Sequence, residues 1–463
     1  MNTTLALQLH VVPSPVTLSG AGCSMSDLLA ARAQMAISLG FHIVFAAIGI
    51  ALPALMVFAE ARGLRRGDPV YLEIARAWAR GAAIFFAVGA VSGTVLSFEL
   101  GLLWPAFMER AGPWIGLPFA LEGFAFFTEA IFLGIYLYGW NRVPPAAHLA
   151  AGALVAVSGA ASALFVLAVN GWMNAPTGFT VGPGGTFENA DPIAALANPF
   201  WIPNTIHMLI GAYQATAFGA AGIHAAVLLR DPGHRFHREA LRIVLAVAAV
   251  TSLLQPLSGD YNARMLHEVQ PIKLAAMEGQ FRTETCAPLR IGGMPSLEER
   301  RTRFALEIPC GLSWMVGHDA DARVLGLDAF PENEWPDPRP VHVAFQIMVG
   351  IGSLLALLGA WGAWIAWRHA SRIGEHRRLL WALVAAAPLG FVAIEAGWVV
   401  TELGRQPWII VGHMRVAEAL TPMPGIGVSL ALYSAIYLGL AWIVVQLMRR
   451  QIRGIPPSQE PGA

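Results

Sequence analysis

The sequence predicts an all-α membrane protein with about nine transmembrane helices. Hydrophobic residues make up 56% of the 463 residues and charged residues only 13%, whereas a soluble domain carries about 25% charged residues. Nine mostly apolar segments also approach the ~20 residues that a helix needs to cross a bilayer. These predicted spans are 34–59, 80–103, 117–140, 148–171, 205–229, 239–257, 341–367, 379–401 and 424–448. The net charge of zero gives no indication of a nucleic-acid partner.

The arginines between the spans predict the orientation, because short cytoplasmic loops are enriched in Lys and Arg. Arginine follows the first, third, fifth, seventh and ninth spans, whereas 173–204 contains neither Lys nor Arg. We therefore expect the N-terminus outside and the C-terminus in the cytoplasm. The expected organisation is an N-terminal extension (1–26), six helices (27–257), a long outer loop (258–340), three helices (341–448) and a cytoplasmic tail (449–463).

One carboxylate, Glu395, lies well inside the apolar segment 379–401. An ionisable side chain at such a depth is costly and marks a functional candidate. Glu402 follows seven positions later, on the same face if the helix continues. The run Gly404-Arg405-Gln406-Pro407-Trp408 then ends the helix, because proline disfavours a helical conformation in the residue before it.

Other polar side chains are predicted near Glu395, in the outer half of the bundle. One buried histidine alone would more often be a packed, hydrogen-bonded residue, but several ionisable groups at one depth favour a shared site. A His/Met pair is typical of a low-spin haem that only passes electrons, which fits His207 and Met348. His42 and Glu395 could each be the single ligand of a haem that keeps one position open. We expect His224 to be structural and the loop histidines to be solvated, namely His234, His237, His267, His318, His369, His376 and His413.

In these motifs the sequence resembles subunit I of the cytochrome bd family of quinol oxidases. The similarity covers nearly the whole chain, in order. It is carried by residues 395–398 with 404–408, by 121–129 with 139–140, and by 170–173, 269–278 and 345–349.

The resemblance implies three haems and a role for each motif. His207 and Met348 would ligate a low-spin haem b, while His42 and Glu395 would ligate a high-spin haem b and a haem d (or a further haem b). Glu99, Glu122 and Glu129 would serve the di-haem pocket and proton delivery together with Glu395. Lys273, the single lysine, and Glu278 would bind quinol. Four further residues would support the haems: Trp398, Arg405, Gln406 and Trp408.

The implied function is that of a terminal respiratory oxidase in the bacterial cytoplasmic membrane. It would oxidise ubiquinol or menaquinol at the outer face and reduce O2 to water with cytoplasmic protons, without a need for pumping. The partners would be a homologous membrane subunit II and, in some complexes, a single-span small subunit. The outer loop is short, and Gln346 stands where some members place an arginine, so haem d and haem b remain alternatives at the oxygen site.

A rival interpretation is a non-catalytic membrane cytochrome b that binds quinol and passes electrons to a partner. That protein would need His207 and Met348, but not His42 together with Glu395. Separately, Cys286 and Cys310 both fall in the outer loop, where an oxidising environment allows disulfides. The sequence leaves a bridge and two free thiols as equal alternatives.

Overall fold

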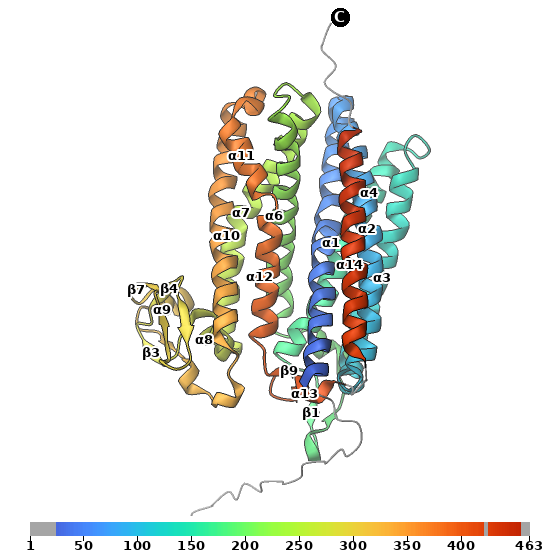
Figure 1. The fold of residues 1–463 in the computed structure, drawn as a ribbon. Coiled ribbons are helices and arrows are strands. Elements are labelled where there is room, and N and C mark those ends of the chain that lie inside the picture. The colour runs from blue at the N-terminus through green and yellow to red at the C-terminus, as the bar shows by residue number, and fades with distance from the viewer. Residues whose placement is uncertain (1–24, 421–424, 455–463) are drawn as a thin grey trace, which may run out of the picture.

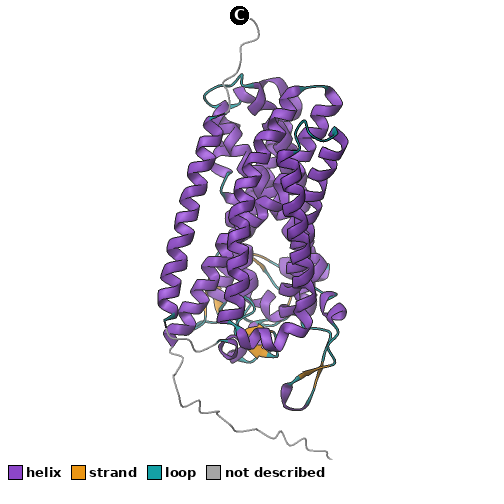
Figure 2. Cartoon of the chain, turned by 90° about the vertical axis from the view of Figure 1, so that its right-hand side faces the viewer, coloured by secondary structure: helices purple, strands orange, loops and turns teal. Residues whose placement is uncertain are grey.

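The structure, a computed structural model, describes residues 25–420 and 425–454. Long helices form one bundle (Figures 1 and 2). They are α1 (Met25–Arg66), α2 (Pro69–Leu103), α3 (Pro105–Tyr138), α4 (Pro145–Asn174), α6 (Trp201–Leu228), α7 (Arg235–Val269), α10 (Pro338–Arg368), α12 (Leu389–Leu403) and α14 (Ile426–Arg453). Apart from Met25 and Ser26, the predicted extension 1–26 lies outside the described residues, as does most of the tail 449–463.

The helical membrane fold is confirmed, but the count of nine spans is not. Within the described residues, eight helices are long and apolar enough to cross a membrane. The predicted fifth span lies in α6, which is 28 residues long but is not one of the eight. Its polar side chains, among them Asn204, His207 and Gln214, lower its hydropathy.

The helices extend beyond several of the predicted spans, and two differences bear on the site. The sixth span was expected to end at residue 257, whereas α7 continues to Val269. The eighth span is divided into α11 (Arg377–Ala386) and α12 around Pro388, which lacks the backbone N–H that a continuous helix needs. Consequently α12 is a short helix of 15 residues with its own direction (Figure 1).

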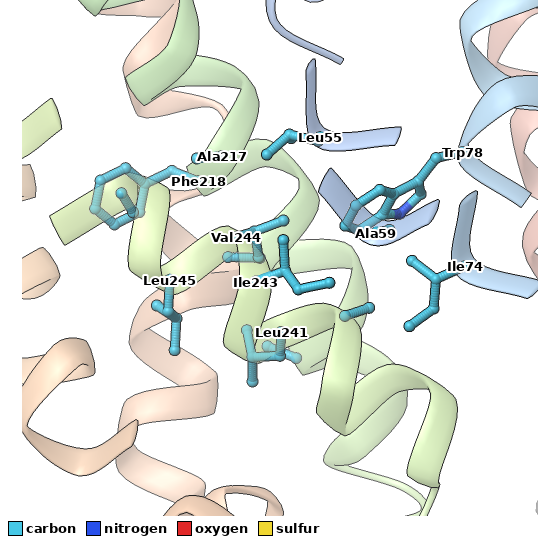
Figure 3. Close-up of a cluster of buried hydrophobic side chains, with 14 of the residues drawn as sticks. Leu55, Ala59, Ile74, Trp78, Ala217, Phe218, Leu241, Ile243, Val244 and Leu245 are labelled. Carbon is cyan, nitrogen blue, oxygen red and sulfur yellow. The ribbon is translucent and has the colours of Figure 1, made fainter. Parts of the chain in front are cut away.

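The main buried core joins α1, α2, α6 and α7. Figure 3 shows part of this cluster, with Leu55 of α1 and Trp78 of α2 on one side and Phe218 of α6 and Leu245 of α7 on the other. Small residues such as Ala217 are fully buried there. Small side chains let membrane helices approach closely, because apolar burial alone gives helices little reason to associate in lipid.

The long connection between α7 and α10 is compact. It contains α8 (Pro271–Glu278), α9 (Gly311–Gly317) and the strands β3 (Glu284–Thr285), β4 (Leu289–Ile291), β5 (Met294–Ser296), β6 (Arg301–Arg303), β7 (Leu306–Ile308) and β8 (Arg323–Val324). The strands pair antiparallel as β3–β8, β4–β7 and β5–β6. A disulfide joins Cys286 and Cys310, which settles the alternative left open by the sequence.

Smaller elements cover the same end of the bundle. They are β1 (Thr180–Val181), β2 (Phe187–Glu188), α5 (Pro192–Leu196), β9 (Trp408–Ile410), β10 (Met414–Arg415) and α13 (Val416–Ala419). This end also holds the start of α1 and the long connection, whereas α14 ends at the opposite end (Figure 1).

Candidate functional site

Helix α12 lies between α10 and α1 in the bundle (Figure 1) and presents different residues to each. Toward α1, the Glu395 carboxylate approaches Gly40, where an added Cβ would lie 3.3 Å from its Oε2. Toward α10, Gly397 faces Met348, and a Cβ there would lie 2.9 Å from the methionine sulfur. The helix therefore separates Glu395 from Met348 although Gly397 is only two residues from Glu395.

The His42 ring spans from α1 to α2. Its Nδ1 lies 2.9 Å from the Ser92 hydroxyl oxygen. That hydroxyl donates its one hydrogen to backbone carbonyls of α2, including Val88 at 3.0 Å. With its hydrogen directed at these carbonyls, Ser92 accepts from His42, and this arrangement puts the ring proton on Nδ1 and leaves the Nε2 lone pair for a ligand. Gly93 makes room for the ring: an added Cβ would lie 3.0 Å from His42 Cε1.

The His207 ring is held in the same way between α6 and α7. Its Nδ1 lies 2.9 Å from the Ser258 hydroxyl oxygen, which donates to the Gln255 carbonyl at 2.9 Å. The same reasoning places the proton on Nδ1 and the lone pair on Nε2. The Gln255 side-chain amide lies 3.2 Å from that Nε2. Helix α6 begins at Trp201, before the start of the predicted span 205–229, so His207 lies in its second turn.

These side chains have the donor chemistry that haem iron requires. Metal-bound histidines usually donate their other ring N–H to an outer partner that fixes the tautomer. Ser92 and Ser258 are in the position of such partners here. Within the described part of the chain, Glu395 Oε1 is buried and has no hydrogen-bond partner. A buried acceptor without a donor is costly, so a bound cation or iron would satisfy it. His42, His207, Met348 and Glu395 thus fit haem ligation.

The predicted proton-carrying glutamates lie on α2 and α3. Glu122 accepts from the Ser162 hydroxyl of α4 at 3.1 Å, and a Cβ at Gly159 of α4 would lie 3.5 Å from the Glu129 carboxylate. Glu99 of α2 accepts from the Gln34 amide of α1 at 2.9 Å. Glu122 and Glu129 therefore share the seam between α3 and α4, whereas Glu99 faces α1.

The seam between α3 and α4 ends in a second polar group. Seven residues beyond Glu129 on α3 is Tyr136, which is fully buried. The His148 ring contacts the Tyr136 carbonyl at 2.9 Å and the Glu60 carboxylate of α1 at 2.8 Å. Polar side chains thus recur at one heptad spacing along α3, which keeps them on one face of the helix.

A network links Lys273 of α8 to the segment after α12. The Lys273 ammonium donates to Asn174 Oδ1 of α4 and to the Thr401 carbonyl. Glu402 accepts from Asn170 at 2.8 Å and from the Arg405 guanidinium. Predicted motifs far apart in the sequence, 170–173, 269–278 and 404–408, therefore meet at one end of the bundle.

The two predicted quinol-binding residues, Lys273 and Glu278, are both buried, and the pKa of each is shifted. Burial and the nearby Arg405 guanidinium lower the pKa of Lys273 to about 7, although Glu402 opposes the shift. Burial raises the pKa of Glu278 to about 8, against the opposing charge of Arg290. Neither Glu278 oxygen has a hydrogen-bond partner among the described side chains and backbone. Both groups can therefore exchange protons close to neutral pH.

A cavity of about 210 Å³ lies between the start of α8 and the segment after α12. Its lining includes Gln270, Arg405, Gln406 and Trp408. The Arg405 side chain is only 4% exposed, and its Nε and Nη1 have no partner within the described ranges. The cavity therefore offers buried positive donors that suit an anionic group such as a carboxylate. Trp398, the remaining predicted cofactor residue, lies half-buried on α12.

Comparison with known families identifies this architecture. Residues 30–456 match the family model of the cytochrome bd terminal oxidase subunit I. The chain belongs to this family. As a cytochrome bd oxidase subunit I it is a multi-pass protein of the bacterial cytoplasmic membrane, and the family implies haem cofactors.

Several relatives match almost end to end. A Bacillus subtilis protein with the provisional name cytochrome bd menaquinol oxidase subunit I is 36% identical, covering 94% of this chain and 99% of the relative. The cytochrome bd ubiquinol oxidase subunit 1 of the same organism is 30% identical over 93% of this chain and 94% of the relative. The solved bd oxidase of Geobacillus thermodenitrificans matches with a TM-score of 0.88 and 38% identity, covering 94% of this chain and 100% of that one.

In this cytochrome bd subunit some functional candidates escaped the sequence analysis. Ser92 and Ser258 were missed, although a buried histidine signals the need for a partner on a neighbouring helix. The expectation that His237 is solvated is wrong: it is 1% exposed and its Nδ1 lies 2.9 Å from that of His224. His234 is buried as well. His234 caps the start of α7 and His237 lies in its first turn, a polar stretch that a hydropathy profile assigns to a loop.

Proposed function

We propose that this subunit oxidises quinol at the outer end of the bundle and reduces O2 to water with protons taken from the cytoplasm. Two quinols would release four electrons and four protons, and one O2 would take up four electrons and four protons to form two waters. The observation that carries the proposal is the arrangement around α12, which has Met348 on one side and the Glu395 carboxylate on the other. A pure electron carrier would need only the Met348 side.

Three haems would fit this assignment: a low-spin haem b held by His207 and Met348, and two high-spin haems (b with d, or b with b) served by His42 and Glu395. When bound, the haems accept electrons and bind O2. The chain's own contribution is to fix the histidine tautomers through Ser92 and Ser258. Arg405 would pair with a haem carboxylate through its buried, unpartnered nitrogens, and Gln406, Trp398 and Trp408 would line the same region.

The quinol proton would pass to Glu278. Its pKa is raised to about 8 by burial, so the carboxyl is protonated below that pH and becomes a proton acceptor above it. Quinol oxidation should therefore rise with pH through about 8, as long as Arg290, which faces Glu278, keeps its charge. The pH profile of quinol-driven O2 consumption tests this expectation. Glu278→Gln should remove the rise, and an unchanged profile in that variant would exclude Glu278 as the acceptor.

The protons for water would travel along the α3–α4 seam. Glu122 and Glu129 are spaced to relay protons between Ser162 and the group formed by Tyr136, His148 and Glu60. The arginine distribution supports placing that group on the cytoplasmic side, with the C-terminus. Charge would then be separated across the membrane without pumping, because quinol protons leave on one side and water protons enter from the other.

The proposal includes a partner. The family resemblance supports a homologous membrane subunit II beside this chain, and a single-span small subunit in some complexes. Exposed apolar side chains on α14, such as Val428 and Trp442, leave that helix free for lipid or a second subunit.

One spectrum separates oxidase from electron carrier. Reduced protein should show haem bands, and a part of them should shift when carbon monoxide is added. Haem without a carbon-monoxide-reactive fraction would favour the non-catalytic cytochrome b, and the absence of haem would refute both.

A further inference from the structure

His342, near the start of α10, is completely buried, at 0% exposure, and has no part in the mechanism above. Its two ring nitrogens contact two different segments of the long connection. Nδ1 lies 2.7 Å from the carbonyl oxygen of Met277, and Nε2 lies 3.0 Å from that of Gly292. Carbonyls only accept hydrogen bonds, so each contact needs an N–H on the ring nitrogen that makes it.

One helical turn further along, Gln346 binds the same connection. Its Oε1 accepts from the backbone N–H of Gly292 at 2.9 Å, and its Nε2 donates to the Arg290 carbonyl at 2.9 Å. Residues four apart lie on one helical face. This face of α10 therefore contacts β4 and the turn after it at three polar atoms and the end of α8 at one.

The contact with Met277 matters because Glu278 comes next. Gly279 ends α8 in a left-handed conformation (φ +59°), and its carbonyl accepts from the Thr302 hydroxyl at 2.9 Å. Glu278 itself makes no side-chain hydrogen bond to the described residues. Its carboxylate is therefore placed by the backbone on each side: His342 fixes the preceding carbonyl and Thr302 the following one.

The same helix leads directly to a candidate iron ligand. Met348 lies six residues after His342, a rise of about 9 Å at 1.5 Å per residue. A shift of the α8 end against α10 would therefore change the separation of Glu278 from the Met348 site. His342, which joins α10 to the Met277 carbonyl, is placed to keep that separation constant.

We propose that His342 is a positioning residue for quinol oxidation, which holds the Met277 carbonyl and so fixes Glu278 relative to the Met348 end of α10. This inference rests on the proposed function, in which Glu278 accepts the quinol proton. The contact with Gly292 is secondary, because Gln346 also holds that turn.

Three variants in the complete oxidase test the inference. The amide nitrogen of asparagine in His342→Asn can take the place of Nδ1 and keep the Met277 contact. The longer side chain of His342→Gln places its amide nitrogen near Nε2 and keeps the Gly292 contact. His342→Phe removes both donors while retaining a ring.

We expect His342→Asn to keep kcat/KM for quinol within about threefold of the natural protein. His342→Gln and His342→Phe should lower it by about tenfold or more, the scale of one lost hydrogen bond that leaves a buried group unpaired. O2 consumption driven by a reduced phenylenediamine, a one-electron donor that does not need the quinol contacts, should be unchanged in all three. The reduced haem spectrum should be unchanged as well, which shows that each variant is assembled.

Equal losses in His342→Asn and His342→Gln would overturn the inference, as would no loss in any variant. A parallel loss of donor-driven O2 consumption would also overturn it, because it would indicate a general structural role. If the natural protein itself consumes O2 with the artificial donor but not with quinol, the proposed function fails at the quinol step, and the variants are not the cause.

Discussion

The surroundings of His42 and His207 are alike in the serine that contacts each ring, but the two proposed sites differ in their second residue. Each ring places its Nδ1 2.9 Å from a serine hydroxyl on the next helix, and each serine also lies within hydrogen-bond distance of a backbone carbonyl of its own helix. Each ring also lies beside a glycine, Gly93 or Gly259. The chain thus holds two imidazole rings in equivalent surroundings on separate helix pairs.

The difference lies in what α12 and α10 bring to each site. The proposed assignment pairs His207 with the Met348 thioether, and a His/Met pair is typical of a haem iron that only passes electrons. Toward α1, the helix that carries His42, α12 presents the Glu395 carboxylate instead. Under the proposed function, the second residue assigned to each site would set its reactivity, whereas the histidine side is common to both.

The largest effect should follow removal of the Glu395 charge. Glu395→Gln keeps the volume but loses a ligand or direct partner of the iron, so O2 consumption should fall by more than about a hundredfold, beyond the ~10–100-fold typical of outer partners. Reduction of the His207-side haem by quinol should continue. An oxygen electrode and a reduction spectrum measure the two. Glu109→Gln, at an exposed position on α3, is the matched control; similar losses in both variants would contradict the assignment.

The two serines should give an intermediate effect, each confined to its own site. Ser92→Ala removes the acceptor for His42 Nδ1–H, and Ser258→Ala removes that for His207. Loss of such an outer partner costs ~10–100-fold in affinity or activity. Haem content and the carbon-monoxide signal should fall in Ser92→Ala, whereas the low-spin band should change in Ser258→Ala. If each variant changed both signals, the two sites would not be separate.

Alanine substitutions at the glycines beside the two rings should have the smallest effect, and the effect should differ between Gly93 and Gly259. A Cβ at Gly93 would lie 3.0 Å from His42 Cε1, inside the ~3.5–4.0 Å of an ordinary carbon contact. A Cβ at Gly259 would lie 3.6 Å from His207 Cε1. Gly93→Ala should therefore cost ~1–3 kcal/mol. Gly259→Ala should be neutral or stabilising by ~0.5–1 kcal/mol, because alanine favours helix. Thermal unfolding of the haem-loaded protein measures both, and the reverse order would refute the geometry.

The sequence predicts the membrane helices well, because a bilayer-length run of apolar residues can satisfy its backbone polar groups in lipid only as a helix or within a closed barrel. The prediction fails where a helix continues through a polar stretch of sequence. The segment 258–269 resembles a loop in composition, yet it extends α7, since Ser258 and Asn262 bond to neighbouring backbone and side chains. The break at Pro388 was also missed, and it is what gives α12 its separate direction.

The candidate ligands were found from depth and residue type, but their grouping was not. Their positions along the predicted spans place His42, His207, Met348 and Glu395 at a similar depth in the membrane. Only the packing of α12 shows that Glu395 approaches α1 at Gly40, whereas Met348 of α10 contacts α12 at Gly397. Ser92, Ser258 and His342 escaped because a serine or histidine in an apolar run has no periodic pattern. Their partners lie 50 to 65 residues away in the sequence, beyond any local signal.

The carbon-monoxide spectrum of Met348→Leu tests the central claim most directly. In the natural protein, carbon monoxide should shift only the haem on the Glu395 side of α12. Leucine conserves volume, so the fold should lose less than ~1.5 kcal/mol, while the His207 iron loses its second ligand. We predict a high-spin shift of that haem and a second carbon-monoxide-reactive fraction, with the first fraction intact. An unchanged low-spin band in Met348→Leu would contradict the account, because Met348 would then not be the residue that closes the His207 site.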